Sequence, residues 1–312
     1  MRGLFVSDGE VRFQNDLAAP VVASGECRVR VLCAGVCATD LALVRGYMGF
    51  CGVPGHEFVG ECLDGPLAGR RVVGEINAAC GECAACLAGN ERHCPTRTVL
   101  GILGRGGAFA EELALPARNL HEVPDNVTTA AATFTEPLAA AFEIPAEIDL
   151  PPGRRALVLG DGRLGLLCAQ VLALHGQEVT LEGRHPERQS FLRAGVSYAQ
   201  GESGASYPLV VEATGRPEVL QSALARVEPR GTLVLKTTSE APAALDLAPL
   251  VVNEIRLVGS RCGPFAPALE ALARGDVAVE AMIDARFPLE RGAEALEAAA
   301  RPGVLKVLID VE

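Results

Sequence analysis

Length, composition and charge set the first limits on this chain. Its 312 residues suit about two domains of ordinary size. The net charge is -11, with 39 acidic and 28 basic residues, which disfavours a nucleic-acid partner because phosphates need cations. No apolar run approaches the ~18 residues of a membrane span, and no signal peptide pattern is present. We therefore expect a soluble, cytoplasmic protein with no membrane partner.

Two short motifs in the first sixty residues carry side chains that suit a metal ion. Residues 35–41 read GVCATDL and residues 55–60 read GHEFVG, which together offer Cys37, His56 and Glu57. Taken singly, Cys37 fits a small core residue equally well, and His56 fits a surface histidine. A short helix is predicted over residues 40–45, and Thr39 would suit its N-cap.

Four cysteines then lie close together in the stretch ACGECAACLAGNERHCP, at residues 79–95. In a long chain without a signal peptide, such a cluster indicates metal binding more than disulfides. The spacing C-x2-C-x2-C-x7-C suits one tetrahedral zinc ion, which four thiolates would close off from substrate. A disulfide staple and an iron-sulfur cluster stay open as alternatives. The four candidate ligands are Cys80, Cys83, Cys86 and Cys94.

A further candidate ligand follows in TEPLA, at residues 135–139. Glu136, just before Pro137, also suits the first turn of a helix, where a carboxylate meets the positive helix end. Together with the motifs at 35–60, however, it completes a set of one thiol, one imidazole and one or two carboxylates. Catalytic zinc uses mixed sets of this kind and keeps one position open.

The stretch ALVLGDGRLGLLCAQVLAL, at residues 156–174, predicts a dinucleotide-binding loop. An apolar strand leads into G-x-G-x-x-G and then into a helix, which is the context that this fingerprint requires. The glycines let the backbone approach a pyrophosphate at the positive helix end. The loop consists of Gly160, Asp161, Gly162, Arg163, Leu164 and Gly165.

Strands and helices continue to alternate after this loop, which predicts a parallel, doubly wound α/β sheet. Further strands are expected over residues 178–181, 209–212 and 232–236. Helices are expected over residues 186–194 and 217–227.

The motifs, taken in order, resemble the zinc-dependent medium-chain dehydrogenases and reductases over essentially the whole chain. They are GVCATD, GHEFVG, the four-cysteine stretch, AFAEEL, VPDNV, TEPLA and GDGRLG. The resemblance implies a GroES-like, mainly β catalytic domain over 1–125, with a structural zinc lobe at about 79–95. It implies a Rossmann domain over 126–264 and a C-terminal segment, 265–312, that returns to the catalytic domain. The glutamate at position 136 is similar to the polyol, glucose and threonine dehydrogenase branch.

The resemblance also implies a role for each matching residue of the candidate catalytic site. Cys37 and His56 would bind the catalytic zinc, with Glu136 in the third-ligand position. Glu57 would be the neighbouring carboxylate that either coordinates or withdraws, and which glutamate binds in the resting enzyme is left open. Thr39 would begin a proton relay. Where many relatives carry the next histidine, this chain has alanine, so solvent or a cofactor ribose hydroxyl would continue the relay.

The cofactor is expected to be a nicotinamide dinucleotide, held by the fingerprint loop, by Thr214 and by Lys306. Lys306 matches a basic family position near the pyrophosphate, and a solvated strand-edge lysine is the alternative. Glu182 lies at the distance from the first glycine where an acid would favour NAD. The family's register instead places Gly183 at the acid position beside Arg184, which suits a 2'-phosphate. We therefore expect NADP, with NAD as the alternative.

The expected activity is zinc-dependent hydride transfer between this cofactor and a small alcohol or carbonyl substrate. Two other classes stay open: a non-catalytic or redox-sensing zinc and dinucleotide-binding protein, and a zinc-free quinone or enoyl reductase. The resemblance suggests a homodimer or homotetramer. The sequence does not indicate the particular substrate or the physiological direction.

Overall fold

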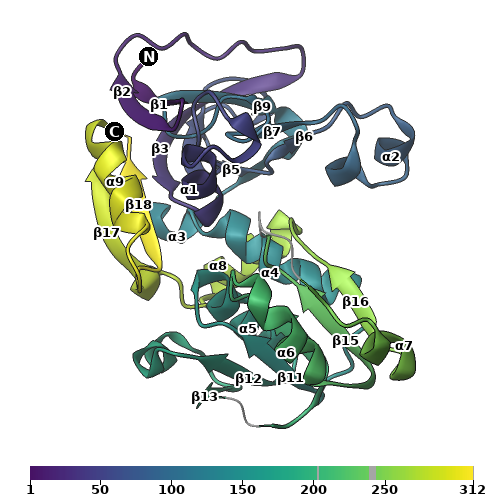
Figure 1. The fold of residues 1–312 in the computed structure, drawn as a ribbon. Coiled ribbons are helices and arrows are strands. Elements are labelled where there is room, and N and C mark those ends of the chain that lie inside the picture. Colours follow the sequence, from purple (N-terminus) through teal and green to yellow (C-terminus); the bar gives the residue numbers. More distant parts are fainter. Residues whose placement is uncertain (202–203, 239–243, 312) are drawn as a thin grey trace. The chain divides into compact units, whose positions relative to one another are not determined.

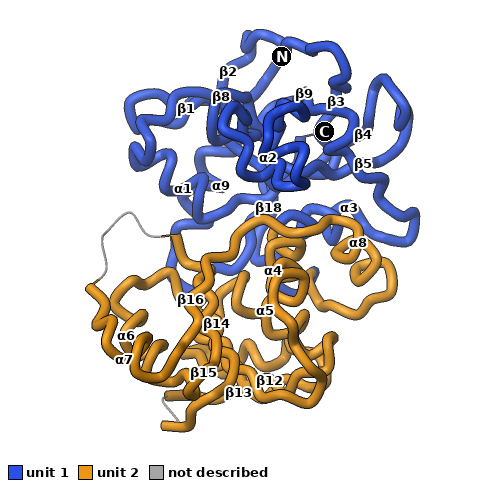
Figure 2. Tube along the Cα trace, turned by 90° about the vertical axis from the view of Figure 1, so that its right-hand side faces the viewer, with its two compact units in different colours: residues 1–136, 280–312 blue, residues 137–279 orange. Residues whose placement is uncertain are grey.

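The computed structural model describes residues 1–201, 204–238 and 244–311. The chain forms two compact units, one of Met1–Glu136 with Glu280–Glu312 and one of Pro137–Val279 (Figure 2). The first division falls after Glu136 rather than at residue 126, and the second falls after Val279 rather than at 265. Among the described residues, no helix is long and apolar enough to cross a membrane.

The first unit is built on a sheet with the strand order β10-β5-β4-β3-β18-β17, in which β9 also pairs with β3. Along β3 (Glu26–Gly35), Cys27, Val29 and Val31 are buried and alternate with exposed arginines, so one face of this strand enters the core. The last strand of the chain, β18, pairs antiparallel with β3 and parallel with β17 (Figure 1). The other strands of this sheet are β4 (Glu57–Cys62), β5 (Arg71–Gly74), β9 (Glu112–Pro116), β10 (Leu120–Glu122), β17 (Ile283–Pro288) and β18 (Lys306–Asp310).

Smaller elements complete the first unit. A hairpin joins β1 to β2, and a small sheet has the order β6-β7-β8. The strands are β1 (Gly3–Ser7), β2 (Glu10–Gln14), β6 (Asn77–Ala78), β7 (Thr98–Leu100) and β8 (Gly104–Arg105). The α-helices are α1 (Ala38–Val44), α2 (Ala84–Leu87), α3 (Thr129–Ala132) and α9 (Gly292–Ala299), and α4 (Thr135–Glu147) begins here and continues into the second unit.

The second unit contains a six-stranded, wholly parallel sheet with the order β13-β12-β11-β14-β15-β16. This is the 3-2-1-4-5-6 order of a doubly wound dinucleotide-binding fold. Its strands are β11 (Arg155–Leu159), β12 (Glu178–Gly183), β13 (Val196–Gln200), β14 (Tyr207–Glu212), β15 (Val227–Leu235) and β16 (Arg256–Gly259). Its helices are α5 (Arg163–Leu174), α6 (Leu220–Ala225), α7 (Ala248–Val252) and α8 (Phe265–Arg274).

The predicted α-helix over residues 186–194 is wrong. The structure has a 3-10 helix, η5 (Pro186–Phe191), and Leu192 after it is extended, with φ -86° and ψ 148°. The helix predicted over 217–227 begins as a 3-10 turn, and its α-helical part ends at Ala225, because Val227 already belongs to β15.

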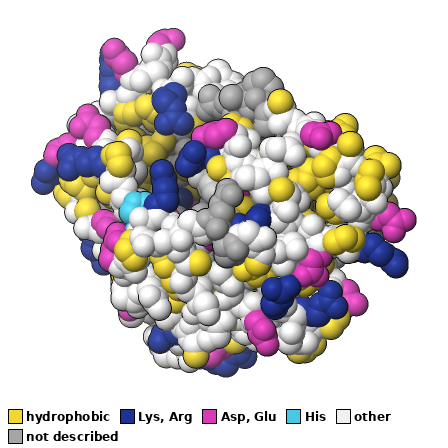
Figure 3. Space-filling view, turned by 60° about the horizontal axis from the view of Figure 1, so that its bottom comes forward, with side chains coloured by type: hydrophobic (Ala, Val, Ile, Leu, Met, Phe, Trp, Pro, Cys, Tyr) yellow, Lys and Arg dark blue, Asp and Glu magenta, His cyan; other side chains and the backbone are white. Residues whose placement is uncertain are grey.

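On the face drawn in Figure 3, acidic, basic and apolar side chains are interspersed.

Candidate metal and cofactor sites

Three predicted ligands, Cys37, His56 and Glu57, lie together in the first unit. Cys37 follows the end of β3 and is the N-cap of α1, while Glu57 begins β4. Because β3 and β4 are antiparallel, with Gly35 opposite Glu57, the end of one strand meets the start of the other. One ligand atom from each of the three side chains lies within 4.8 Å of the others. The group offers sulfur, nitrogen and oxygen, a donor set that suits zinc.

Asp40 positions two of these ligands from a fully buried place in α1. Its Oδ2 accepts a hydrogen bond from the backbone N–H of Cys37 at 2.8 Å, and its Oδ1 lies 3.2 Å from His56 Nδ1. A histidine that donates through Nδ1 presents Nε2 as the metal ligand. Burial lowers the pKa of His56, but the negative charges of Asp40 and Cys37 outweigh it and raise the pKa well above the usual value. Asp40 was missed as a site residue, although its place three residues after Cys37 is that of a capping box.

Glu57 has one satisfied and one unsatisfied carboxylate oxygen. Its Oε2 accepts a hydrogen bond from Lys306 Nζ, and neither side chain has exposed surface. Its Oε1 is buried and has no hydrogen-bond partner among the described residues. A buried oxygen without a partner is costly, so this atom fits a role as a metal ligand.

Lys306 is fully buried, so it is not a solvated strand-edge lysine. Its ammonium group lies against Glu57 and 5.2 Å from the centre of the Phe134 ring. Burial lowers the pKa of Lys306 to about 8. The structure thus brings this residue, predicted to contact the cofactor, to the candidate metal site.

Glu136 and Thr39 are less closely tied to the three-residue group. Glu136 is the second residue of α4, is half-buried, and does not belong to the group within 4.8 Å. The Thr39 hydroxyl lies 3.9 Å from Cys37 Sγ. The N-cap of α1 is Cys37, so Thr39 does not have the capping role suggested for it.

The four-cysteine stretch forms a separate cluster around α2. Its sulfur atoms all lie within 4.8 Å of one another, with separations of 3.5 Å for Cys83 and Cys86, 3.6 Å for Cys80 and Cys94, and 3.9 Å for Cys80 and Cys86. Zn–S bonds of about 2.3 Å in a tetrahedron need sulfur atoms roughly 3.8 Å apart. The backbone N–H of Cys80 donates to Cys94 Sγ and lowers the pKa of that thiol to about 6. The cluster therefore fits a closed zinc site.

The fingerprint glycines of the second unit have the geometry that a pyrophosphate needs. Gly160 has φ +104°, where other residues are strained, and a Cβ atom on Gly165 would lie 1.8 Å from the Gly160 carbonyl oxygen. A Cβ atom on Gly162, the N-cap of α5, would meet nothing within 4 Å. The loop is thus tightly held at its ends and open at the helix N-terminus, where phosphate would bind.

Glu182, Gly183 and Arg184, the residues predicted to select the cofactor, lie at or just after the end of β12, and each has different contacts. Glu182 Oε2 lies 3.1 Å from a guanidinium nitrogen of Arg226. Gly183 packs against the side chain of Asp161, and Arg184 is exposed. Thr214, after β14, donates its hydroxyl hydrogen to Glu212 at 2.6 Å.

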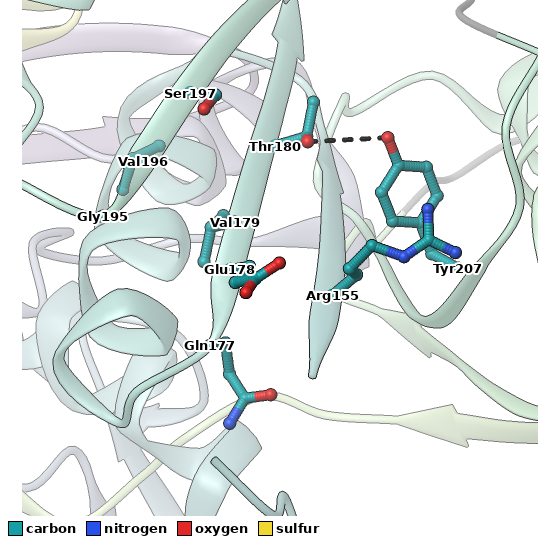
Figure 4. Close-up of a pocket in the computed structure, with 9 residues that line it drawn as sticks. All are labelled: Arg155, Gln177, Glu178, Val179, Thr180, Gly195, Val196, Ser197 and Tyr207. Carbon is teal, nitrogen blue, oxygen red and sulfur yellow. Dashed lines mark hydrogen bonds between the residues drawn. The ribbon is translucent and has the colours of Figure 1, made fainter. Parts of the chain in front are cut away.

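A separate hollow of about 500 Å³ lies at the amino ends of the strands of this sheet (Figure 4). Arg155, Glu178, Val196 and Tyr207, which begin β11, β12, β13 and β14, contribute to its wall, and the Tyr207 hydroxyl reaches Thr180 Oγ1 at 3.5 Å. Ligands of doubly wound sheets bind at the carboxyl ends of the strands. The hollow lies at the amino ends, so it is not the dinucleotide site.

Known proteins share this architecture. Residues 23–125 match the family described as the alcohol dehydrogenase GroES-like domain. The L-threonine 3-dehydrogenase of Streptomyces coelicolor is 32% identical over 274 residues, which cover 78% of this chain and 79% of that enzyme. The alcohol dehydrogenase TADH from Thermus sp. ATN1 superposes with a TM-score of 0.90 at 27% identity and covers 100% of both chains. A short chain alcohol dehydrogenase of Escherichia coli CFT073, solved in complex with NADH, superposes with a TM-score of 0.89 at 25% identity. The match covers 100% of this chain and 99% of that enzyme.

The chain belongs to the zinc-dependent medium-chain dehydrogenase/reductase family, as its motifs predicted. Its fold is the predicted α/β combination of a GroES-like domain and a Rossmann sheet. It is an oxidoreductase that uses a nicotinamide cofactor.

Proposed function

We propose that the chain is a zinc enzyme that transfers a hydride between a nicotinamide cofactor and a small alcohol or carbonyl compound. The observation that carries this proposal is the group formed by Cys37, His56 and Glu57, held within 4.8 Å on the unit that matches the GroES-like family. A zinc-free reductase would have no use for such a group. A non-catalytic protein would not need an open set of ligands beside the closed four-cysteine set.

The side chains of this unit would hold the metal and prepare the proton transfer. A zinc ion bound there would supply Lewis acidity, which lowers the pKa of a bound alcohol or polarises a carbonyl. Cys37 and the Nε2 atom of His56 would serve as fixed ligands, because Asp40 orients both residues. Glu57 would offer Oε1, which has no hydrogen-bond partner in the described part of the chain, and Glu136, at the start of α4, is proposed as a further carboxylate ligand.

Thr39 is proposed as the first group of the proton relay. Its hydroxyl lies 3.9 Å from Cys37 Sγ and can accept the proton of a substrate alcohol while donating its own. Ala42 cannot continue the relay, so the proton passes to solvent or to a cofactor ribose hydroxyl.

Secondary alcohols and polyols are the proposed substrate class, with aldehydes and ketones in the reverse direction. The similarity to an L-threonine 3-dehydrogenase and to alcohol dehydrogenases supports this choice. A cytoplasmic homodimer or homotetramer is proposed from the family alone, and light scattering would measure the assembly. The sequence favours NADP through Gly183 and Arg184.

Two measurements on the purified protein test the proposal. Elemental analysis is expected to give about two zinc ions per chain, one for each cluster. Absorbance of reduced nicotinamide is expected to rise when NAD⁺ or NADP⁺ is supplied with a panel of polyols and secondary alcohols. About one zinc per chain, together with no turnover of either cofactor on the alcohols or on the matching carbonyls, would contradict the proposal.

A further inference from the structure

Asp161, in the fingerprint loop, occupies the space of a side chain at the end of β12. A Cβ atom added to Gly183 would lie 2.3 Å from both Cγ and Oδ2 of Asp161. In a dinucleotide-binding sheet, an acid about 20 residues beyond the first glycine, near the end of the second strand, binds the adenosine ribose. Here the strand ends in a glycine, and the carboxylate at that place comes from the loop instead.

The carboxylate of Asp161 is the centre of a cluster of hydrogen-bond donors. Its Oδ2 accepts from the backbone N–H groups of Arg184 and His185, at 2.9 and 2.7 Å, and from the Tyr198 hydroxyl at 2.7 Å. Its Oδ1 makes longer contacts, 3.2 Å to His185 Nδ1 and 3.4 Å to Arg188. Successive N–H groups and cations arranged in this way make a binding site for one anion, and the Asp161 carboxylate already occupies it.

The charge of Asp161 is maintained by this cluster. Burial acts to raise the pKa of the carboxyl. Hydrogen bonds from Tyr198 and His185 lower the pKa by more than burial raises it, so the net pKa lies below its usual value. Asp161 is therefore ionised at neutral pH, and its side chain is only 7% exposed. A poorly solvated negative charge repels a second anion strongly.

The neighbouring charged groups do not reverse this effect. Glu182, the acid at the expected distance from the first glycine, is paired with Arg226. The side chain of Arg188 already faces Asp161, with one nitrogen 2.7 Å from its carbonyl oxygen. Arg184 gives its backbone N–H to Asp161, and its guanidinium is exposed, so it would meet a phosphate in solvent. A contact of that kind in solvent is weak.

We infer that Asp161 determines cofactor specificity and makes NAD(H) the preferred partner of the proposed dehydrogenase. The carboxylate takes the donors that a 2'-phosphate would need, and Oδ1, with its longer contacts, is the oxygen that can accept a ribose 2'-hydroxyl hydrogen. The inference rests on the proposed function and reverses the preference for NADP drawn from Gly183 and Arg184.

Calorimetric titration with NADH and with NADPH tests this role. The wild-type protein is expected to bind NADH at least about tenfold more tightly, a difference of roughly 1.4 kcal/mol. Asp161→Ala empties the donor cluster and is expected to shift the affinity ratio toward NADPH by about tenfold or more. Asp161→Asn keeps the volume and one carbonyl acceptor but removes the charge, and a smaller shift of the same sign is expected. Thermal melting of each variant shows whether it is folded, and the Asn variant decides the outcome if the Ala variant is not.

Three results would overturn the role of Asp161 while leaving the dehydrogenase intact. One is a wild-type preference for NADPH. Another is an equal loss of affinity for both cofactors in the Asp161 variants, which would make the residue purely structural. The third is a change of preference in Glu182→Gln instead. Failure of the wild-type protein to bind either cofactor would instead remove the proposed function itself.

Discussion

The ammonium group of Lys306 donates a hydrogen bond to Oε2 of Glu57 in a place where neither side chain has exposed surface. The two residues are 249 positions apart and meet because β3 lies between β18 and β4 in the sheet. Gly35 in β3 makes room for them, since a Cβ atom there would lie 2.5 Å from Nζ and 2.7 Å from Oε2. The pair therefore joins the last strand of the chain to the candidate metal site.

Lys306→Met is expected to destabilise the metal-free protein by about 3 to 5 kcal/mol, because it leaves the Glu57 carboxylate buried without a cation. Urea denaturation of wild type and variants in the presence of a zinc chelator measures the free energy of unfolding. The matched control is the double variant Lys306→Met with Glu57→Gln, which removes both charges and is expected to recover a large part of the loss. A single variant as stable as the wild type would show that the carboxylate has another partner.

Cys37→Ser and Cys83→Ser separate the two clusters. Each variant is expected to lose about one zinc ion per chain, as measured by elemental analysis. Cys37→Ser should lower turnover by about a hundredfold or more with little change in melting temperature, because its metal acts on substrate. Cys83→Ser should lower the melting temperature by several degrees, because the metal bound by the four cysteines would stabilise the folded structure around them. Equal loss of folding in both variants would contradict the division into catalytic and structural sites.

The parts of the fold that the sequence predicted are those with local signals. The apolar strand at 156–159 and the glycines after it predict β11 and the start of α5 without any distant contact. The α-helix predicted over 186–194 failed because the chain from Leu192 is extended and reaches β13 after only a few residues. Periodicity indicates where a helix can form, but not whether the connection has room for one.

The candidate sites show the same limit. Cys37, His56 and Glu57 were found because thiol and imidazole are distinctive ligands within short motifs. The sequence does not predict the contacts of Asp40 and Lys306 at this site. An aspartate in a helix and a lysine in an apolar strand are not distinctive by themselves, and their partners lie 16 and 249 residues away. Asp161 was placed at the cofactor, but its contact with Gly183 depends on a turn that no sequence pattern specifies.

Asp40→Asn is expected to weaken zinc binding at the candidate catalytic site by about ten- to a hundredfold, the usual effect of losing the partner of a ligating histidine. The amide can donate as well as accept, so it no longer fixes His56 with Nε2 toward the metal. Competition with a chromogenic chelator measures the affinity of the weaker site, and the four-cysteine cluster serves as the internal control. Unchanged affinity would mean that the fold, rather than Asp40, holds His56.

Glu26 provides a test of pH dependence away from both metal clusters. Its side chain is 9% exposed and accepts a hydrogen bond from Arg105 at 2.6 Å. Burial acts to raise the pKa of Glu26, but the hydrogen bonds from Arg105 and from the N–H of Ala23 lower it, so the net pKa lies below the usual 4.5. The folded state therefore binds the proton less tightly than the unfolded state does, and the carboxylate stabilises the fold above the unfolded pKa.

Glu26→Gln should accordingly cost about 1 kcal/mol at neutral pH. The difference from the wild type should shrink as the pH falls below about 4.5, where the unfolded chain takes up the proton first and the folded carboxylate follows at lower pH. Urea denaturation of both proteins between neutral pH and pH of about 3.5 measures this difference, and metal effects common to both cancel. Glu10→Gln is the matched control, because Glu10 pairs with Arg12 on the surface, with side chains 63% and 73% exposed, and should change stability little at any pH. Parallel stability curves for Glu26→Gln and the wild type would show that the charge of Glu26 does not stabilise the fold.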